Sequence, residues 1–243
     1  MAGPPDNAGS LAARIAETAL FDSAWVATQL GLPASLSRLE LAHHYLSADH
    51  RAVSPHPLFE PGWLYPGDRW RGRAPDPLTW YLHEGTGGPA HPLAEQDLDA
   101  GYEDWVARLH DDTELPQPGG GTLRYGAVRA AALAAIAPPP PPTPEPLVPG
   151  RVTVALLDHS GPRRLVTWMR RLRRAHLPAD PELEILVVTS DPGPARLGAT
   201  VGLTVAPSRT LRLPSGAGAW TAALTAAAGE VIVWVSTALE PPL

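Results

Sequence analysis

The ten residues 152–161 read VTVALLDHSG, and this stretch decides the fold of the last third of the chain. Its six apolar or β-branched residues predict a strand that is buried on both faces, and the polar turn after them predicts the end of that strand. A second run of this kind, Leu183–Val188, is followed by the turn Thr189–Gly193. Val201–Val205 and Glu230–Val235 predict two further strands.

Helical patterns separate these strands. The basic segment Arg163–Arg174 predicts an amphipathic helix with Leu165, Trp168, Met169 and Leu172 on one face, and the arginines on the rest of this helix indicate either a solvated face or phosphate binding. The arginines of this helix are Arg163, Arg164, Arg170, Arg171, Arg173 and Arg174. Further along the chain, Gly216–Ala228 predicts a helix of small residues.

Strands that alternate with helices are joined by crossover connections and form a parallel sheet. Ligands of parallel α/β sheets bind in the crevice beyond the carboxyl ends of the strands. The sequence therefore predicts one crevice there, and any chemistry of the chain belongs in it. The residues expected around it are Asp158, His159, Thr189, Ser190, Asp191, Ser236 and Thr237.

A run of prolines divides the chain. Pro138–Pro149 contains eight prolines in twelve residues and predicts an extended, semi-rigid spacer. The alanine-rich segment Ala127–Ile136 before it predicts a helix. We therefore predict three parts: a helical module at 1–114, a Pro/Gly-rich linker at 115–150 and an α/β unit at 151–243.

The upstream part contains an internal repeat with a period of about 35 to 38 residues. Phe21-Asp22-Ser23-Ala24-Trp25 recurs as Phe59-Glu60-Pro61-Gly62-Trp63, and His44-Tyr45-Leu46 recurs as Trp80-Tyr81-Leu82. Each unit closes on a His-Pro-Leu turn, at His56 or His91. The pattern predicts a small helical repeat module, which can also offer a surface to a protein partner. Its aromatic residues indicate a packed core or, as the alternative, a sugar-stacking surface.

The histidines of this part do not predict a metal site. His43 and His44 are adjacent, so on a helix they point about 100° apart, whereas a helical metal site needs ligands three or four residues apart. His56 and His91 recur at matching positions of the repeat, which favours a role in forming the turn.

Composition limits the function classes. The 243 residues carry 19 basic residues, all of them arginine, and 25 acidic residues, for a formal charge of −6. This balance argues against a nucleic-acid partner or a broad anionic-membrane surface. The chain has no cysteine, which excludes disulfides and thiolate chemistry. No apolar run is long enough for a transmembrane segment, and Met1–Ser10 lacks a secretion signal, so we expect a cytoplasmic protein.

Two ordered resemblances identify a candidate family. VTVALLDHSG, then EILVVTSD at 184–191, then the helix that leads through Ala226-Ala227-Ala228-Gly229-Glu230 into a strand, resemble the amino-terminal half of family 2 glycosyltransferases, which have the GT-A fold. The upstream repeat is similar to the repeats that precede the transferase domain in some bacterial polysaccharide glycosyltransferases. Together the resemblances cover about Phe21–Leu93 and Arg151–Leu243. The expected fold class is therefore α/β: a helical repeat module, a Pro-rich linker and an incomplete Rossmann-like parallel sheet.

The resemblance implies sugar transfer from a nucleotide-sugar donor to a glycan acceptor, with Mg²⁺ or Mn²⁺ as cofactor where donor binding is retained. It implies a truncated protein or an eroded donor site, because the 93 residues after Gly150 match only the donor-binding half. The general base belongs to the acceptor half, so the catalytic residues stay unknown. The implied donor-binding residues are those of the predicted crevice together with Gly216 and Thr221.

The chain departs from the family at four of these residues. Thr189 stands where the family has an aspartate for the nucleotide base, and Asp191 follows two residues later as a substitute. Thr221 stands where an asparagine is usual. Ser236-Thr237-Ala238 replaces the Asp-x-Asp motif that holds the metal, so arginines would have to neutralise the donor diphosphate in its place.

There are two alternatives to a glycosyltransferase, and the first follows from these departures. The first is a non-catalytic scaffold, in which the aromatic repeats bind a glycan or a protein and the α/β unit has lost its donor site. The second, a dinucleotide-dependent dehydrogenase, is disfavoured because the turn Asp158–Pro162 lacks the Gly-x-Gly-x-x-Gly phosphate-binding pattern.

Overall fold

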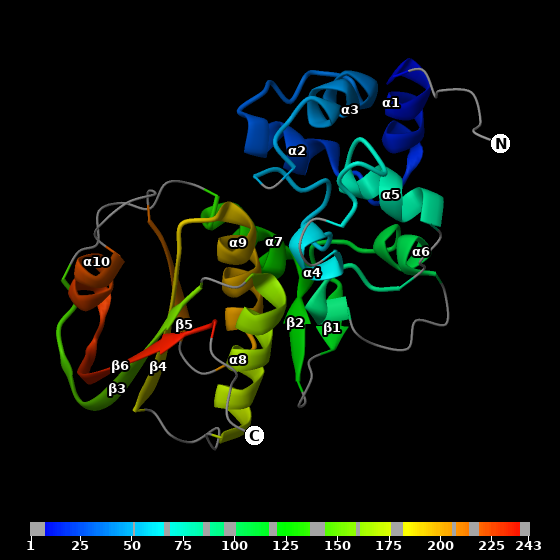
Figure 1. Cartoon of the computed structure of the whole chain (residues 1–243). Coiled ribbons are helices and arrows are strands. Elements are labelled where there is room, and N and C mark those ends of the chain that lie inside the picture. The colour runs from blue at the N-terminus through cyan, green and yellow to red at the C-terminus, as the bar shows by residue number, and fades with distance from the viewer. Residues whose placement is uncertain are drawn as a thin grey trace. The chain divides into compact units, whose positions relative to one another are not determined.

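The computed structural model shows a mixed α/β protein with a four-stranded parallel sheet (Figure 1). The chain divides into two compact units, Met1–His110 and Asp111–Leu243, which are described separately. The structure describes residues 8–50, 52–65, 69–84, 88–94, 101–116, 121–136, 144–158, 161–175, 182–205, 208–213 and 219–238.

The first unit is built from short helices whose ends are set by capping residues. Asp22 caps α2 by accepting the backbone N–H of Trp25 at 2.9 Å, and Gly31 ends the same helix with a φ of 63°. Ser37 and Glu40 form a capping box at the start of α3. The elements are α1 (Ala8–Glu17), α2 (Ser23–Leu30), α3 (Arg38–Leu46), α4 (Pro61–Leu64), α5 (Pro77–Glu84), the 3₁₀ helix η1 (Pro92–Ala94) and α6 (Tyr102–Val106).

Aromatic side chains form the core of this unit. Phe21, Trp25, Tyr45 and Tyr102 are each at most 1% exposed, and the indole N–H of Trp25 donates to the backbone carbonyl of Ser54 at 3.1 Å. Full burial of such side chains contributes about 1.5–3 kcal/mol each. For these residues, a packed core is confirmed over a sugar-stacking surface.

Residues at matching positions of the two sequence units make matching backbone contacts. The N–H of Asp22 donates to the carbonyl of Pro55 at 2.9 Å, and the N–H of Glu60 donates to the carbonyl of Ala90 at 3.0 Å. In each case the acceptor is the residue directly before the histidine of a His-Pro-Leu turn. The backbone at the start of one helix is thus bound to the turn that closes the same unit.

The matching aromatic pairs also pack alike. The rings of Phe21 and Tyr45 lie edge to face with centroids 5.8 Å apart, and those of Phe59 and Tyr81 lie edge to face at 5.5 Å. These are favourable geometries for aromatic rings.

Both turn histidines form the same local hydrogen bond. Nδ1 of His56 accepts the N–H of Leu58 at 3.1 Å, and Nδ1 of His91 accepts the N–H of Leu93 at 3.2 Å. Burial, with a smaller contribution from His56, lowers the pKa of His91 to about 3. The expected role of these histidines in forming the turn is confirmed.

The second unit contains a small hairpin and the larger sheet. Within the region expected to be a linker, the hairpin and α7 are regular structure, so the predicted helix there is confirmed. The spacer lies partly outside the described residues, and Val148 already belongs to the first strand of the sheet. The elements are β1 (Glu114–Pro116), β2 (Thr122–Arg124), α7 (Tyr125–Ala134), β3 (Val148–Leu157), α8 (Pro162–Ala175), β4 (Leu183–Thr189), α9 (Pro192–Gly202), β5 (Ser208–Arg212), α10 (Ala219–Ala226) and β6 (Gly229–Ser236).

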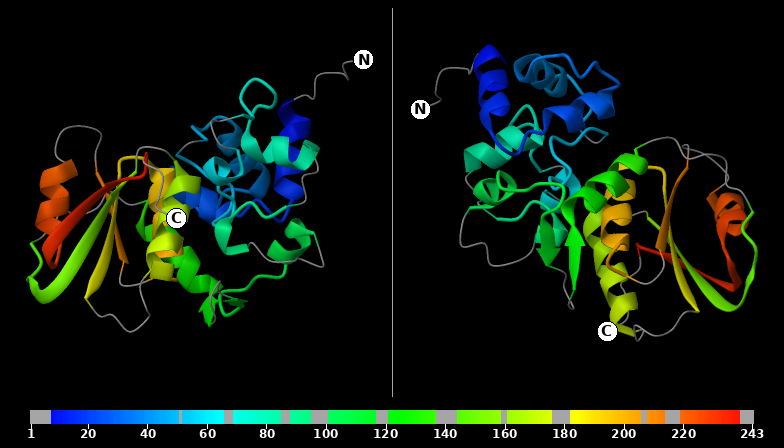
Figure 2. Two further views of the ribbon diagram at one scale, coloured as in Figure 1. Left: turned by 60° about the horizontal axis from the view of Figure 1, so that its bottom comes forward. Right: turned by 180° about the vertical axis from the view of Figure 1, so that it is seen from behind.

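The strands of the sheet are all parallel, in the order β5-β4-β3-β6. Leu157 at the end of β3 is in register with Val188 of β4 and Ser236 of β6, so these strands end at the same edge. Helices α8 and α9 cover one face and α10 covers the other, as two further views confirm (Figures 1 and 2). The predicted parallel sheet is therefore confirmed.

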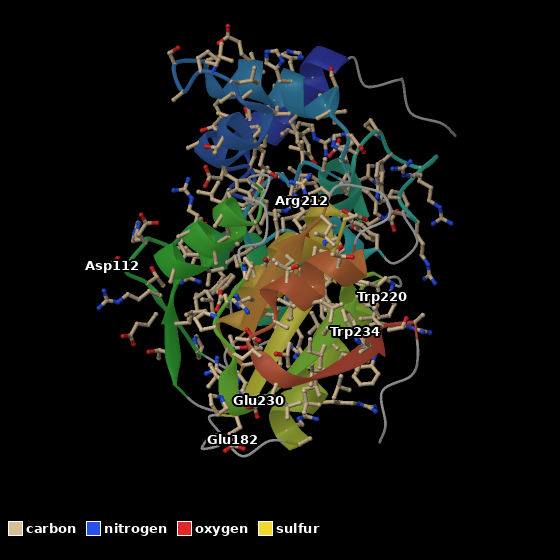
Figure 3. The ribbon with its side chains drawn as sticks, turned by 90° about the vertical axis from the view of Figure 1, so that its left-hand side faces the viewer. Asp112, Glu182, Arg212, Trp220, Glu230 and Trp234 are labelled. Atoms are coloured by element: carbon tan, nitrogen blue, oxygen red, sulfur yellow. The ribbon has the colours of Figure 1, made fainter. Side chains whose placement is uncertain are left out.

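Side chains of both layers meet in the core on the α10 face. Leu157, Leu186, Val188, Ala223 and Ala226 pack together there. Trp234 of β6 packs against this cluster, and the centroid of its ring lies 4.3 Å from the ring centroid of Trp220 on α10 (Figure 3). Trp220 remains 54% exposed.

The prediction of a strand at Val201–Val205 is wrong, because Val201 lies near the end of α9 and the third strand is Ser208–Arg212. Asp191 caps α9 and Pro192 starts it, which favours a helix through this segment. The strand β5 has Arg209 and Arg212 on either side of Thr210 and Leu211 and is half-buried throughout, so it lacks the apolar run that predicts the other strands.

Within the described part of the chain, no helix combines the length and the apolar character that crossing a bilayer requires.

Candidate functional site

The carboxyl ends of three strands lie together at one edge of the sheet. The N–H of Asp158, directly after β3, donates to the carbonyl of Val188 in β4 at 3.0 Å. The N–H of Thr237, directly after β6, donates to the carbonyl of Leu157 in β3 at 3.0 Å. The ladder therefore continues one residue past the strands and sets Asp158 between Thr237 and the end of β4.

Asp158 and Thr237 are also joined through their side chains. Oγ1 of Thr237 donates to Oδ1 of Asp158 at 3.0 Å. Thr237 is fully buried and Asp158 is half-buried, so the carboxylate is the more accessible of the two groups. The pair lies between β3 and β6, the two neighbouring strands that are most distant in sequence.

The turn after β4 is organised around a helix cap. Oγ1 of the buried Thr189 accepts the N–H of Asp191 at 3.1 Å. The carboxylate of Asp191 accepts the N–H of Gly193 at 3.0 Å and caps α9. This carboxylate therefore stabilises the start of the helix, and Ser190 beside it is exposed.

The other predicted residues contribute less to this edge. Oγ of Ser236 accepts the N–H of Ala238 at 3.2 Å, which forms the turn after β6. Thr221 is exposed on α10, and its carbonyl accepts the hydroxyl of Thr225. His159 and Gly216 lie outside the described residues. The side-chain contact at this edge thus joins Asp158 and Thr237, while Thr189 and Asp191 pair with each other.

A second polar cluster, which the sequence patterns do not predict, lies in the interior of the sheet. Glu184 of β4 is 3% exposed. Its Oε2 accepts Oγ1 of Thr153 at 2.7 Å and the N–H of Ala228 at 3.0 Å, and its Oε1 accepts Nε of Arg209 at 2.8 Å. The signal in the sequence was a single carboxylate inside an apolar strand, since such a group is buried only with partners.

Hydrogen bonds control the charge of this glutamate. Burial alone would raise the pKa of Glu184, but the bonds from Thr153, Ala228 and Arg209 outweigh burial and lower the pKa below its ordinary value. Glu184 is thus ionised at neutral pH. Because Arg209 also contacts Glu145 and the carbonyl of Ala226, the cluster binds β4, β5 and the segment before β6 together.

The cluster explains the glycine at the start of β6. The N–H of Gly229 donates to Oγ1 of Thr153 at 2.9 Å. A Cβ atom at Gly229 would lie 2.6 Å from the backbone nitrogen of Thr153 and 2.8 Å from the carbonyl oxygen of Arg151. Only glycine permits this close approach of β6 to β3.

The residues described here hold no group of three or more His, Asp or Glu side chains that could bind a metal ion. At the sheet edge, Asp158 supplies one carboxylate and Thr237 one hydroxyl. Mg²⁺ is often bound by one or two carboxylates together with substrate phosphates. These residues therefore fit a metal ion only when a diphosphate completes its coordination.

Comparison with known proteins adds no family assignment: no family model, no curated protein and no solved structure matches this chain.

Proposed function

We propose that the second unit binds a nucleotide-sugar donor and that the protein is a glycosyltransferase-like protein acting on a glycan hydroxyl. The observation that carries the proposal is the hydrogen-bonded pair Asp158–Thr237 at the carboxyl edge between β3 and β6. If the four strands of the sheet are numbered 1 to 4 along the chain, their order across the sheet is 3-2-1-4, as in Rossmann-like nucleotide-binding folds. Ligands of such sheets bind beyond the carboxyl ends of the strands at the topological switch point. Here this point lies at the ends of β3 and β6, because β4 and β6 lie on opposite sides of β3.

The chemistry of the pair suits a nucleoside. A carboxylate that keeps part of its surface exposed accepts hydrogen bonds from ribose hydroxyls or from a base N–H. Thr237 donates to Oδ1, so it fixes the orientation of the carboxylate. Asp158 is thus the proposed donor-binding residue, and Thr237 positions it.

A Mg²⁺ or Mn²⁺ ion would bind with the donor diphosphate and would neutralise the charge of the leaving nucleotide. Asp158 is the residue that would hold it. Asp191 serves this purpose poorly in its present position, because its carboxylate caps α9.

One observation favours a second candidate, a non-catalytic scaffold. Among the aspartate and hydroxyl residues for which the resemblance implies donor or metal contacts, Thr189 and Thr237 are buried and Asp191 caps α9. In this reading the first unit is the functional part. Its matching contacts at Asp22 and Glu60 support a tandem-repeat module, and such modules bind protein or glycan partners along their stacked units.

Isothermal titration of the full chain with UDP-, GDP- and dTDP-sugars, each with and without Mn²⁺, tests the donor site. We expect binding of at least one donor, stronger with Mn²⁺ and weakened about tenfold or more by Asp158→Asn, since one charge-assisted contact is lost. Asp112→Asn is the matched control, because Asp112 is an exposed aspartate of the same unit outside the sheet (Figure 3). Failure of every donor to bind would support the scaffold, and binding that Asp158→Asn leaves unchanged would place the site elsewhere.

A further inference from the structure

A cavity of about 440 Å³ lies in the first unit, between the turn after α3 and the segment before α5. Its volume is within the range of roughly 300–1,000 Å³ that small-molecule sites have. It belongs to a different unit from the donor site proposed above. The cavity is lined by Ala48, Asp49, His50, Trp70, Arg71, Gly72, Ala74 and Pro75.

His50 contributes a buried polar group to this cavity. Its side chain is 8% exposed, and its ring lies 4.7 Å from that of Tyr45 and 5.8 Å from that of Trp70. Nδ1 of His50 has no hydrogen-bond partner among the described residues. A buried polar atom without a partner costs about 1–3 kcal/mol. Because Nδ1 of His50 has almost no accessible surface, the lining has to shift for a ligand hydroxyl to reach it, and the hydrogen bond formed then recovers this cost.

The neutral state of His50 favours a hydroxyl group as that ligand. Burial lowers the pKa of His50 against the opposing influence of Asp76 and Asp49, so the ring is uncharged near pH 7. In a neutral imidazole, one nitrogen donates and the other accepts. A hydroxyl group both donates and accepts, so it can bind Nδ1 in either tautomer.

The rim of the cavity offers both kinds of hydrogen-bonding partner. The exposed Asp49 accepts hydrogen bonds and the exposed Arg71 donates them, and their charges cancel. A lining without net charge favours neither an anion nor a cation. Trp70, Ala48, Ala74 and Pro75 add apolar surface, which suits the C–H groups of a sugar ring.

We propose that this cavity binds a neutral sugar unit, with hydroxyl groups that bond to His50, Asp49 and Arg71. The proposal does not depend on donor binding in the second unit. It makes the first unit a carbohydrate-binding module whether or not the chain transfers sugar.

Saturation-transfer difference NMR of the full chain tests the proposal. The probes are the methyl glycosides of glucose, galactose, mannose, rhamnose and N-acetylglucosamine. We expect saturation transfer to at least one of them. We expect Arg71→Ala to reduce the affinity for that glycoside at least about fivefold, and His50→Phe, which keeps a ring in the core, to reduce it to a similar extent.

Arg73→Ala is the matched control. Arg71 and Arg73 are both exposed, and each guanidinium lies over a tryptophan, at 5.4 Å from the centroid of Trp70 and 5.5 Å from that of Trp80. Only Arg71 lines the cavity. Arg73→Ala is therefore expected to keep the wild-type affinity.

The proposal would be overturned by no saturation transfer to any glycoside, by equal losses in the two arginine variants, or by Arg71-dependent binding of inorganic phosphate without any sugar. Added UDP and the Asp158→Asn variant separate the two sites. A sugar signal that both leave unchanged supports the cavity, whereas a signal that UDP abolishes assigns the sugar to the donor site instead.

Discussion

Glu184 accepts a hydrogen bond from Oγ1 of Thr153 at 2.7 Å, across two neighbouring strands in the interior of the parallel sheet. The same carboxylate accepts the N–H of Ala228 and pairs with Arg209. One buried charge thus joins β3, β4, β5 and the backbone that leads into β6. The start of β6, and through it the position of Thr237, depends on this cluster.

Replacement of Glu184 by glutamine is expected to destabilise the second unit by about 2–4 kcal/mol, because Arg209 loses its buried anionic partner. Thermal and urea unfolding followed by tryptophan fluorescence measure the change. Glu182→Gln is the control, since Glu182 is exposed two residues earlier. Equal stability of the two variants would show that the cluster adds nothing to the fold.

Substitution of Gly229 by alanine is expected to cost about 1–3 kcal/mol of unfolding free energy, because the added methyl group overlaps the backbone of Thr153 and Arg151. Gly9→Ala provides the contrast. Gly9 is the second residue of α1, with no atom within 4 Å of an added Cβ, so alanine there is expected to change the unfolding free energy by less than about 0.5 kcal/mol. The midpoints of urea unfolding, compared between variants with the same m-value, measure both changes in stability. A neutral Gly229→Ala would contradict the close approach of β3 and β6.

Much of the second unit was predictable because its signals are local. The runs of β3, β4 and β6 are apolar and end in polar turns, so their existence and parallel arrangement follow from the sequence. The sequence does not predict strand β5, because its burial depends on its neighbours in the sheet. The segment Val201–Val205 resembles a strand, but Asp191 and Pro192 start a helix that reaches Gly202. That capping role also shows why a candidate carboxylate cannot be assigned from its position alone.

The interior cluster and the cavity were beyond sequence reasoning for a different reason. Thr153, Glu184, Arg209 and Gly229 are separated by up to 76 positions in the chain, and only the register of the strands brings them together. His50 and Trp70 likewise meet through the packing of helices and turns. By contrast, the role of His56 and His91 was predictable, because each bonds to a residue two positions away.

The stability of the first unit is expected to depend on pH through His91. The pKa of His91 is about 3 in the folded protein and about 6.5 in the unfolded chain, so the unfolded chain binds the proton first as the pH falls. The contribution of His91 to the free energy of unfolding is therefore complete above about pH 6.5. It decreases as the pH falls toward 3, by at most about 1.4 kcal/mol per pH unit.

His91→Asn removes this titration and keeps an oxygen that can accept the N–H of Leu93. We expect the variant to lose stability less steeply than wild type between pH 6.5 and 4, as measured by urea unfolding at each pH. His43→Asn, at an exposed position on α3, is expected to keep the wild-type slope. Parallel slopes for His91→Asn and wild type would contradict a buried neutral His91.

The contact between Thr237 and Asp158 can be measured by a double-mutant cycle. Thr237→Val keeps the volume and shape of a fully buried side chain but removes the hydroxyl that donates to Oδ1. We expect a loss of about 0.5–1.5 kcal/mol in the wild-type background and a smaller loss when Asp158 is already alanine. If donor binding occurs at this edge, Thr237→Val should also weaken it, because the carboxylate is no longer oriented. A coupling energy near zero would mean that the two residues are neighbours without a functional bond, and the proposed donor site would then rest on Asp158 alone.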